Sequence, residues 1–408
     1  MKVKLLLVAL AARATTALTA LWTFPSILLS AFLVAWAAEA AQFLISQGMA
    51  LAILAWLQTL PEFAVEAVIA WQAGHDPSSC FVASPPVGCH SHLAVANYTG
   101  AIRLLVGLGW PMIYFVAAYF RRRRNERALQ PIHLDDEHSV EVLATVPPLL
   151  YFVWIWYKSS INLVDAGVLL VMYVVYLAVL WRFPPQHEES LADAPAPARW
   201  AYTRPGRWRV IAIAGLFLAG GLLIYLTAHP FVESMLAVAI SLGVSEFVFV
   251  QWVAPFLSEF PEKVSAFQWA STVKKAPMAL MNMLSSNVNQ WTVLAAMIPI
   301  VFSIARGEAA ALPFDGAQRD EILLTVLQSS VAVLLLAHMR FTWWNAVLLF
   351  VLWLAQFLVA EWRKEIAVCY AAWGVLLILG WLRQPPDAPR ILWRLMRQRR
   401  RPAAGGAA

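Results

Sequence analysis

Apolar stretches of about twenty residues or more recur along the whole chain. A helix needs about 20 apolar residues to cross the hydrocarbon core of a bilayer, so each stretch is long enough for one crossing. The sequence is 61% hydrophobic and 13% charged, with a mean hydropathy of +0.65. Soluble domains carry about 25% charged residues, so we predict a polytopic membrane protein surrounded by lipid. Membrane barrels alternate polar and apolar residues, which these runs do not, so the crossings are predicted to be helices.

The runs predict an all-α fold with about ten or eleven transmembrane helices. They lie near 15–37, 41–72, 93–119, 141–157, 161–181, 209–229, 235–270, 277–304, 321–338, 341–360 and 365–382. Residues 183–208 are rich in Pro, Ala and charge, which is typical of a linker. This linker separates a first membrane half, 1–182, from a second half, 209–384, and a basic tail follows at 385–408.

Basic residues gather in four clusters between the apolar runs. They lie at Arg121–Arg124, around Arg204–Arg209, at Lys274–Lys275 and at Arg394–Arg401. The positive-inside rule places all four in the cytoplasm, and eleven crossings then put the N-terminus outside and the C-terminus inside. The net charge of +6 therefore indicates topology, and no nucleic-acid partner is predicted. Without a large regulatory domain or a sorting signal, the chain fits a bacterial inner membrane.

Two other segments leave alternatives open. The start, MKVKLLLVALAARA, is interpreted as an amphipathic or membrane-entry segment, with a signal peptide as the alternative. The 73–92 loop is predicted to face outside and contains Cys80, Cys89 and three histidines. Its spacing matches no standard zinc pattern, so a Cys80–Cys89 disulfide with solvated histidines is favoured over a metal site.

The two halves share a pattern. Each contains a glutamate, an apolar helix, a glycine, a second apolar helix and then Pro-Glu, in copies near 35–119 and 232–305. Pro61-Glu62 and Pro261-Glu262 anchor the alignment. Because five crossings separate the two copies, they are predicted to be inverted in the membrane. Inverted repeats commonly place a binding site at their interface near the bilayer midplane.

Glu62 and Glu262 indicate the chemistry of that site. An ionised carboxylate in a bilayer is costly without a partner, and a proline within a helix frees a backbone carbonyl one turn earlier. Carboxylate, carbonyl, hydroxyl and amide oxygens are the ligands of hard cations, while the absence of a Cys or His cluster beside them disfavours zinc and copper. The other polar residues expected near the two acids are Thr59, Ser258, Asn97, Asn282, Ser286 and Asn287, with two additional acids, Glu66 and Glu259.

These segments resemble the alpha repeats of the calcium/cation antiporter superfamily, the sodium/calcium exchangers. The family motif Thr-Ser-Leu-Pro-Glu corresponds to QTLPE at 58–62 and SEFPE at 258–262. The motif Gly-Asn-x-x-Gly-Ser-Asn corresponds to ANYTGAI at 96–102 and MNMLSSN at 281–287. The resemblance implies calcium binding by the two Pro-Glu glutamates, flanking sodium sites at the asparagines, and hydroxyl or carbonyl donors. By position these roles fall on Glu62 and Glu262, on Asn97 and Asn282, and on Thr59 and Ser258.

The first repeat departs from that pattern. Ala101 and Ile102 stand where Ser and Asn are usual, and Arg103 follows them. A guanidinium there could replace a bound monovalent ion by pairing with Glu62 or Glu66, or serve as a structural counter-ion. Sodium coupling is therefore open.

The leading hypothesis is a secondary antiporter that exchanges calcium, or a related cation, for sodium or protons by alternating access. It needs no cofactor, its partners are inorganic cations, and its oligomeric state is left open. The alternative is a degenerate exchanger-like protein that binds a cation or a partner without transport, in which the glutamates and asparagines are structural. An enzyme is not predicted, because no nucleophile-base arrangement or HExxH-type site is recognisable.

Overall fold

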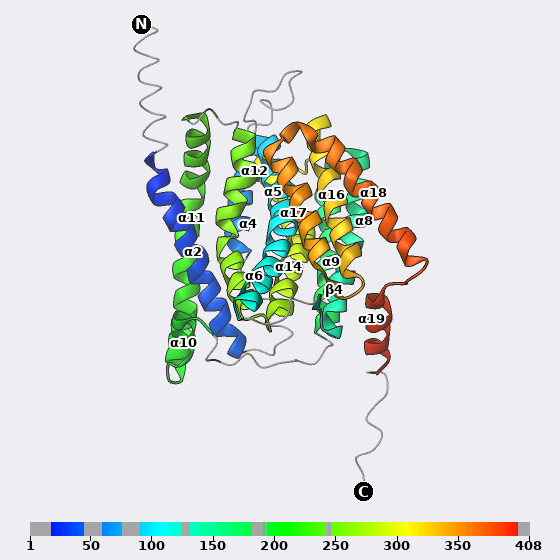
Figure 1. Ribbon diagram of the computed structural model, residues 1–408. Coiled ribbons are helices and arrows are strands. Elements are labelled where there is room, and N and C mark those ends of the chain that lie inside the picture. Colours follow the sequence, from blue (N-terminus) through cyan, green and yellow to red (C-terminus); the bar gives the residue numbers. More distant parts are fainter. Residues whose placement is uncertain are drawn as a thin grey trace.

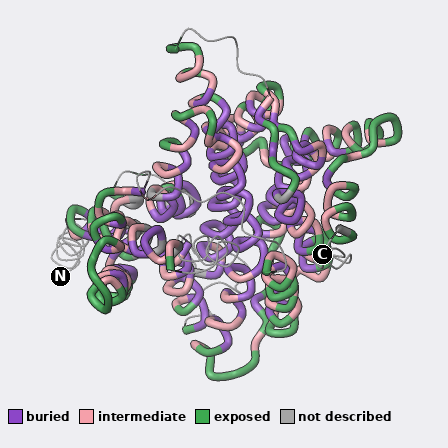
Figure 2. Tube along the Cα trace, turned by 90° about the horizontal axis from the view of Figure 1, so that it is seen from below, coloured by how far each residue is buried: buried purple, intermediate pink, exposed green. Residues whose placement is uncertain are grey.

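A computed structural model describes residues 18–44, 59–75, 90–124, 131–181, 191, 194–241, 243 and 246–398. They form an upright bundle of helices, with α2 and α11 along one side and α18 and α19 along the other (Figure 1). Seen along the bundle axis, buried residues fill the centre and exposed residues lie on the outer helices (Figure 2). The prediction of an all-α polytopic membrane protein is confirmed.

The first half contains α2 (Ala20–Ala41), α4 (Leu60–His75), α5 (His90–Leu104), α6 (Trp110–Arg123), α7 (Ser139–Ala144), α8 (Val146–Lys158) and α9 (Leu163–Leu180). The second half contains α11 (Arg207–Ser241), α12 (Glu246–Ser258), α13 (Phe260–Ser271), α14 (Ala276–Asn289), α15 (Ala295–Arg306), α16 (Gly316–Leu336), α17 (Trp343–Leu358) and α18 (Arg363–Trp381). The predicted linker includes a short helix, α10 (Ala196–Tyr202), and the predicted tail includes α19 (Asp387–Gln398).

Among the described residues, seven helical spans are long and apolar enough to cross a membrane. They are 20–41, 91–123, 139–158, 163–180, 207–231, 276–306 and 363–381. Large apolar side chains on the outer faces of these spans are exposed, among them Leu218, Leu222 and Leu376. Lipid contact explains their exposure, since lipid tails are as apolar as these side chains.

One predicted boundary is wrong. The helices expected at 209–229 and 235–270 are instead a single helix through Ser241, followed by two shorter ones. Pro230 lies inside α11 without ending it, whereas Gly243 adopts a left-handed conformation with φ of 65°. Glycine tolerates that conformation and commonly follows a helix end, so the glycine marks the boundary better than the proline does.

Two short β-ladders show that the halves are inverted. β1 (Ile132–His133) and β3 (Leu312–Pro313) follow the third crossing of their halves, and β2 (Ser160–Ile161) and β4 (Arg340–Phe341) follow the fourth. β1 pairs with β4 and β2 pairs with β3, both antiparallel. The loop after the third crossing of each half therefore meets the loop after the fourth crossing of the other half. Copies in the same orientation could not form these pairs.

The third crossing of each half contains a π-helix at the same place. Leu105–Gly109 separates α5 from α6, and Gln290–Leu294 separates α14 from α15. Each begins eight residues after the aligned asparagine, from 97 to 105 and from 282 to 290. Such π-bulges in α-helices are frequent at functional sites. Their equal placement supports the repeat alignment independently of the Pro-Glu anchors.

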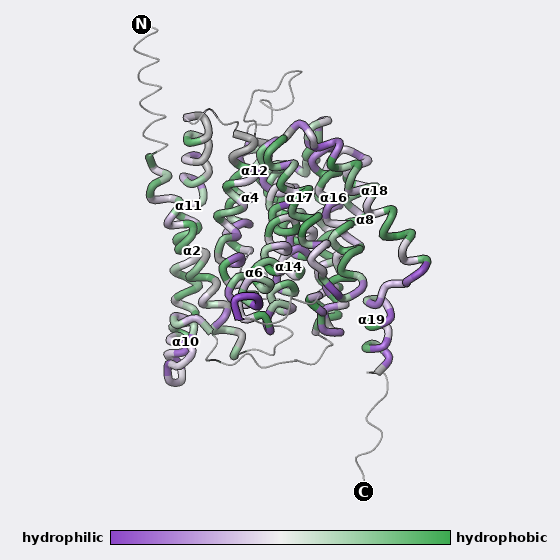
Figure 3. Tube along the Cα trace, in the orientation of Figure 1, coloured by the Kyte–Doolittle hydropathy of each residue, from purple (hydrophilic) through white to green (hydrophobic). Residues whose placement is uncertain are grey.

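The basic clusters that the structure describes lie at one end of the bundle. Arg124, after α6, donates hydrogen bonds to the backbone oxygens of Ser271 and Thr272 at 3.3 and 3.5 Å, which joins the end of α6 to the end of α13. α10 and α19 lie at this same end in Figure 1, and hydrophilic residues mark it in Figure 3. This clustering agrees with the pattern that predicted a cytoplasmic face.

Candidate cation site

Both Pro-Glu pairs begin helices. Glu62 is the third residue of α4, and Glu262 is the third residue of α13, which starts two residues after α12 ends. Proline is well tolerated in a first turn, where its missing N–H has no helical partner to lose. The acids therefore lie at helix starts, whose partial positive charge favours an anion, rather than within continuous helices as the sequence suggested. Gln58, before the first pair, lies outside the described residues.

Every residue predicted for the site is buried. The carboxylates come from the starts of α4 and α13, and the amides and hydroxyls come from α5, α12, α14 and the residue before α4. The buried set comprises Thr59, Glu62, Glu66, Asn97, Ser258, Glu259, Glu262, Asn282, Ser286 and Asn287. Ten polar side chains hidden from solvent in a helical bundle imply mutual pairing or a ligand, because burial without either is costly.

Gln290 joins the two repeats. Its side-chain Nε2 donates to both carboxylate oxygens of Glu62 at 3.1 Å and to Oε1 of Glu259 at 2.7 Å. Glu62 belongs to the first repeat, whereas Glu259 and Gln290 belong to the second. The sequence reading did not single out Gln290, although it follows Asn287 by three residues on the same helix face. It is the first residue of the π-helix.

Lys263 was also missed. It is buried and forms an ion pair with Glu259, one turn earlier in the chain. Glu62 lies within electrostatic range of Glu259, Glu262 and Lys263, so the three acids and the lysine form one charged cluster at the interface of the repeats. The sequence could have pointed to Lys263 as a site residue, because a basic residue stands directly after the second Pro-Glu pair.

Glu66 and Asn97 form a second polar contact within the first repeat. The amide Nδ2 of Asn97 donates to Oε2 of Glu66 at 2.7 Å, and both residues are buried. The second repeat has Ala266 at the position aligned with Glu66, so it cannot form the same contact. The two halves thus share a framework, but they carry different polar groups.

Several buried oxygens of the site accept no hydrogen bond from the described residues. They are Oε1 of Glu66, Oδ1 of Asn97, Oε1 of Glu262, Oδ1 of Asn287 and Oε1 of Gln290. Oxygens of these kinds are the ligands that hard cations prefer. No three acidic, His or Cys side chains of the described residues are close enough together to hold a metal ion as they stand. The donor set is therefore one of mixed amide and carboxylate oxygens. Cys80 and Cys89 lie outside the described residues, so their disulfide stays a prediction.

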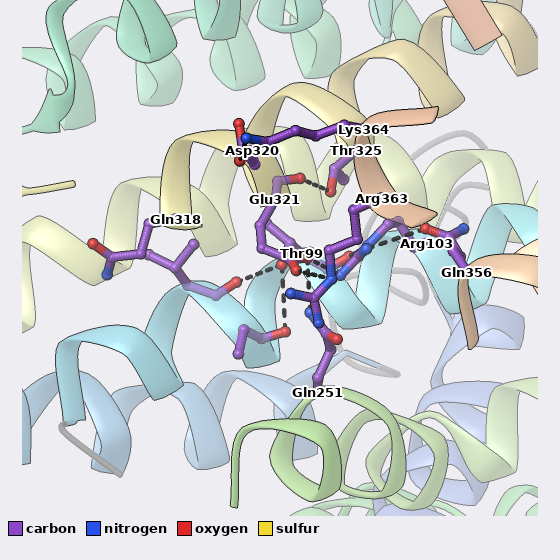
Figure 4. A network of polar contacts seen from close by, with 12 residues as sticks. Thr99, Arg103, Gln251, Gln318, Asp320, Glu321, Thr325, Gln356, Arg363 and Lys364 are labelled. Carbon is purple, nitrogen blue, oxygen red and sulfur yellow. Dashed lines mark hydrogen bonds and ion pairs between the residues drawn. The ribbon is translucent and has the colours of Figure 1, made fainter. Parts of the chain in front are cut away.

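Arg103 lies in a separate network, so the suggested pairing with Glu62 or Glu66 is wrong, and Arg103 is the counter-ion of a different acid. Its guanidinium forms an ion pair with Glu321 of α16 and donates to Gln356 of α17 at 3.1 Å (Figure 4). Arg103 lies six residues after Asn97, or nearly two helical turns along α5, which carries it away from the site acids toward α16 and α17. Glu321 was missed because an acid at the start of an apolar run looks solvated.

Further groups surround Glu321. Arg363, the first residue of α18, contacts its Oε1 at 2.6 Å, and Gln251 of α12 donates to its Oε2 at 2.8 Å (Figure 4). α12 and α5 also approach closely, because a Cβ at Gly100 would lie 1.9 Å from the backbone oxygen of Gln251. The network thus ties α5, which carries Asn97, to α12, whose end leads to Glu259.

Comparisons with known proteins agree with this geometry. The family model described as "Sodium/calcium exchanger protein" matches residues 14–182 and 212–361. A solved structure, "Crystal Structure of H+/Ca2+ Exchanger CAX", is 31% identical, with a TM-score of 0.80, and the match covers 93% of this chain and 92% of that chain. A search of curated proteins found no match.

Two structures of the sodium-calcium exchanger NCX_Mj share the fold. One, soaked with 100 mM Na+ and 10 mM Sr2+, is 16% identical, with a TM-score of 0.51, and the match covers 86% of this chain and 99% of that chain. The other, soaked with zero Na+ and Ca2+, is 15% identical, with the same TM-score, and the match covers 85% and 99% of the two chains.

Proposed function

The chain belongs to the sodium/calcium exchanger protein family, and from this premise we propose that it is a secondary antiporter that exchanges calcium for protons. Glu62 and Glu262 would bind the calcium ion, with buried amide and hydroxyl oxygens completing its shell. The other site residues proposed are Glu66, Glu259, Asn97, Asn282, Thr59, Ser258, Ser286 and Asn287. Calcium and protons are cargo here, and the proposal includes no cofactor.

One observation carries this proposal: Gln290 contacts Glu62 and Glu259, acids that come from opposite repeats. A site built across an inverted-repeat interface can be exposed to either side when one half moves against the other. The proposed moving units are the halves 1–182 and 209–384. The basic end of the bundle would face the cytoplasm, in a bacterial inner membrane, with the N-terminus on the opposite side.

Two observations favour protons over sodium as the driving ion. Ala101 and Ile102 are buried and apolar where the second repeat has Ser286 and Asn287, so the first repeat supplies fewer oxygens for a flanking sodium ion. A proton needs only a carboxylate, and the buried Glu66 offers one that the second repeat lacks. The 31% identical structure is titled an H+/Ca2+ exchanger, which agrees with this choice.

Calcium flux into proteoliposomes tests the proposal. An imposed pH gradient should drive uptake of radioactive calcium, and a sodium gradient of equal size should not. Glu62→Gln and Glu262→Gln should each abolish uptake, while Glu361→Gln, at an exposed position, should leave it intact. Wild-type uptake in both Gln variants would refute the assignment of the site, and sodium-driven uptake would refute proton coupling.

A second candidate function is calcium binding without transport. The ion pair of Lys263 with Glu259 favours it, because a cation built into the site is compatible with binding alone. A protein that only binds calcium would show saturable association in detergent. It would show no uptake under a pH or sodium gradient. The same vesicles therefore separate the two functions.

A further inference from the structure

A buried lysine lies among the carboxylates of the candidate site. Lys263 is 5% exposed and its partner Glu259 is 2% exposed. Glu62 and Glu262 also lie within electrostatic range of its ammonium group. A lysine one helical turn from a glutamate is common on exposed faces, where the pair contributes little. Here both side chains are shielded from water, so the positive charge acts on the whole cluster.

We propose that the ammonium group of Lys263 is a covalently tethered monovalent cation, which completes the charge of the site beside one divalent ion. This inference rests on the proposed function, because it takes the cluster as the calcium site. Its new content is that the chain binds calcium without a dissolved monovalent ion. It also assigns that role to Lys263, which the family motifs do not include.

The charges of the cluster support this role. Glu62, Glu259 and Glu262 together carry three negative charges when ionised, and the ammonium group of Lys263 offsets one of them. Two negative charges remain in this cluster, which excludes Glu66 because that acid pairs with Asn97, and one calcium ion neutralises them. A net charge buried away from water is costly, so a neutral loaded site is the form best suited to cross the membrane interior.

Arg103 does not fill this role. Its charge acts on Glu321, Arg363 and Tyr370, and its guanidinium pairs with Glu321 on the far side of α5. Lys263 is therefore the basic side chain of the described residues that the structure places in the acid cluster. Its position directly after Glu262 puts the charge in the first turn of α13, beside Glu262 and the N-cap residue Glu259.

Removal of this charge should create a requirement for a dissolved cation. In Lys263→Met the cluster keeps three carboxylates, so calcium alone leaves one negative charge buried. A sodium ion that enters the position of the ammonium group would restore neutrality. Lys263→Arg keeps the charge, so its calcium binding should stay independent of sodium. The double variant Lys263→Met/Glu259→Gln removes one charge of each sign, so sodium should not change its affinity for calcium, whatever that affinity is.

The test is equilibrium binding of radioactive calcium to the purified full-length protein in detergent. Measurements at one alkaline pH replace choline by sodium at constant ionic strength. We expect sodium to tighten calcium binding by Lys263→Met about tenfold or more, since one unbalanced charge a few ångströms away has at least that effect at an effective dielectric constant of about 20. The wild type, Lys263→Arg and the double variant should change less than about twofold.

Each outcome decides a different claim. If calcium binding by Lys263→Met does not depend on sodium, while the wild type binds calcium, the tethered-cation inference is wrong and the proposed function stands. If the wild type binds no calcium, the proposed function fails and the inference fails with it. Should Lys263→Met not fold, sodium-dependent binding by the double variant would overturn the inference, because that variant has the wild-type net charge.

Discussion

Replacement of Glu321 by glutamine should destabilise the protein far more than replacement of Arg103 by methionine. Glu321 forms ion pairs with both Arg103 and Arg363, and it is fully buried. Glu321→Gln removes the acidic partner of Arg103, whose guanidinium group is fully buried. Removal of one partner from a buried pair costs about 3–5 kcal/mol, so we expect a loss in that range.

Arg103→Met has a milder effect because Glu321 keeps Arg363 and the amide of Gln251. Loss of a hydrogen bond to a charged group costs about 1.5–3 kcal/mol, and the methionine recovers part of this through apolar packing beside Trp252. The double variant should be more stable than Glu321→Gln alone. Its remaining cation, Arg363, is partly exposed and can turn toward water.

Equilibrium unfolding in mixed detergent and SDS micelles measures these differences, with calcium binding as a check of native structure. The four proteins form a double-mutant cycle, whose coupling energy should exceed about 1 kcal/mol for groups in direct contact. If Arg103→Met lowered the free energy of unfolding as much as Glu321→Gln or more, the greater importance assigned to Glu321 would be refuted. Additive costs would show that the pair in Figure 4 contributes no coupling.

Three further predictions concern the site and its support. Gln290→Leu removes the amide that bridges the two repeats. It should lower the free energy of unfolding by about 1.5–3 kcal/mol in the same assay and also lower calcium flux, and unchanged stability would show that the bridge contributes nothing. Gly100→Ala should destabilise the protein by about 1–3 kcal/mol, because the new methyl group would collide with the backbone oxygen of Gln251, whereas Gly215→Ala has open space and should be tolerated. Glu66→Gln should retain calcium binding but weaken uptake driven by a pH gradient, and full proton-driven uptake in this variant would remove Glu66 from the coupling mechanism.

The sequence predicted the parts of the fold that local patterns determine. Apolar run length predicts a polytopic helical bundle, and the repeated Pro-Glu pairs predict its inverted halves. The pattern placed Glu62 and Glu262 inside continuous helices, because an apolar run does not show where one helix ends and the next begins. Helix ends depend on backbone conformation, which Gly243 shows more clearly than Pro230.

The partners of charged groups could not be predicted in the same way. A pairing of Arg103 with Glu62 or Glu66, the acids of its own repeat, was one possibility, but its partner Glu321 is 218 residues away in the chain. Gln290 reaches Glu62 across 228 residues. Such contacts depend on the direction in which each side chain leaves its helix. The π-helix at Gln290–Leu294, which follows Asn282 in the chain, changes that direction. A sequence without an aligned relative contains no direct signal of it.

The distribution of buried charge gives an argument for cation binding that does not depend on resemblance. The basic side chains buried with the described bundle have acidic partners: Arg103 pairs with Glu321, and Lys263 pairs with Glu259. Glu62, Glu66 and Glu262 form no ion pair with a basic side chain of the described residues, and their donors are neutral amides at Glu62 and Glu66. The acids in excess therefore gather at the repeat interface, where lipid and protein exclude water. Because a buried carboxylate without a counter-charge is costly, protons or cations from solution would stabilise that interface, which agrees with the proposed antiport.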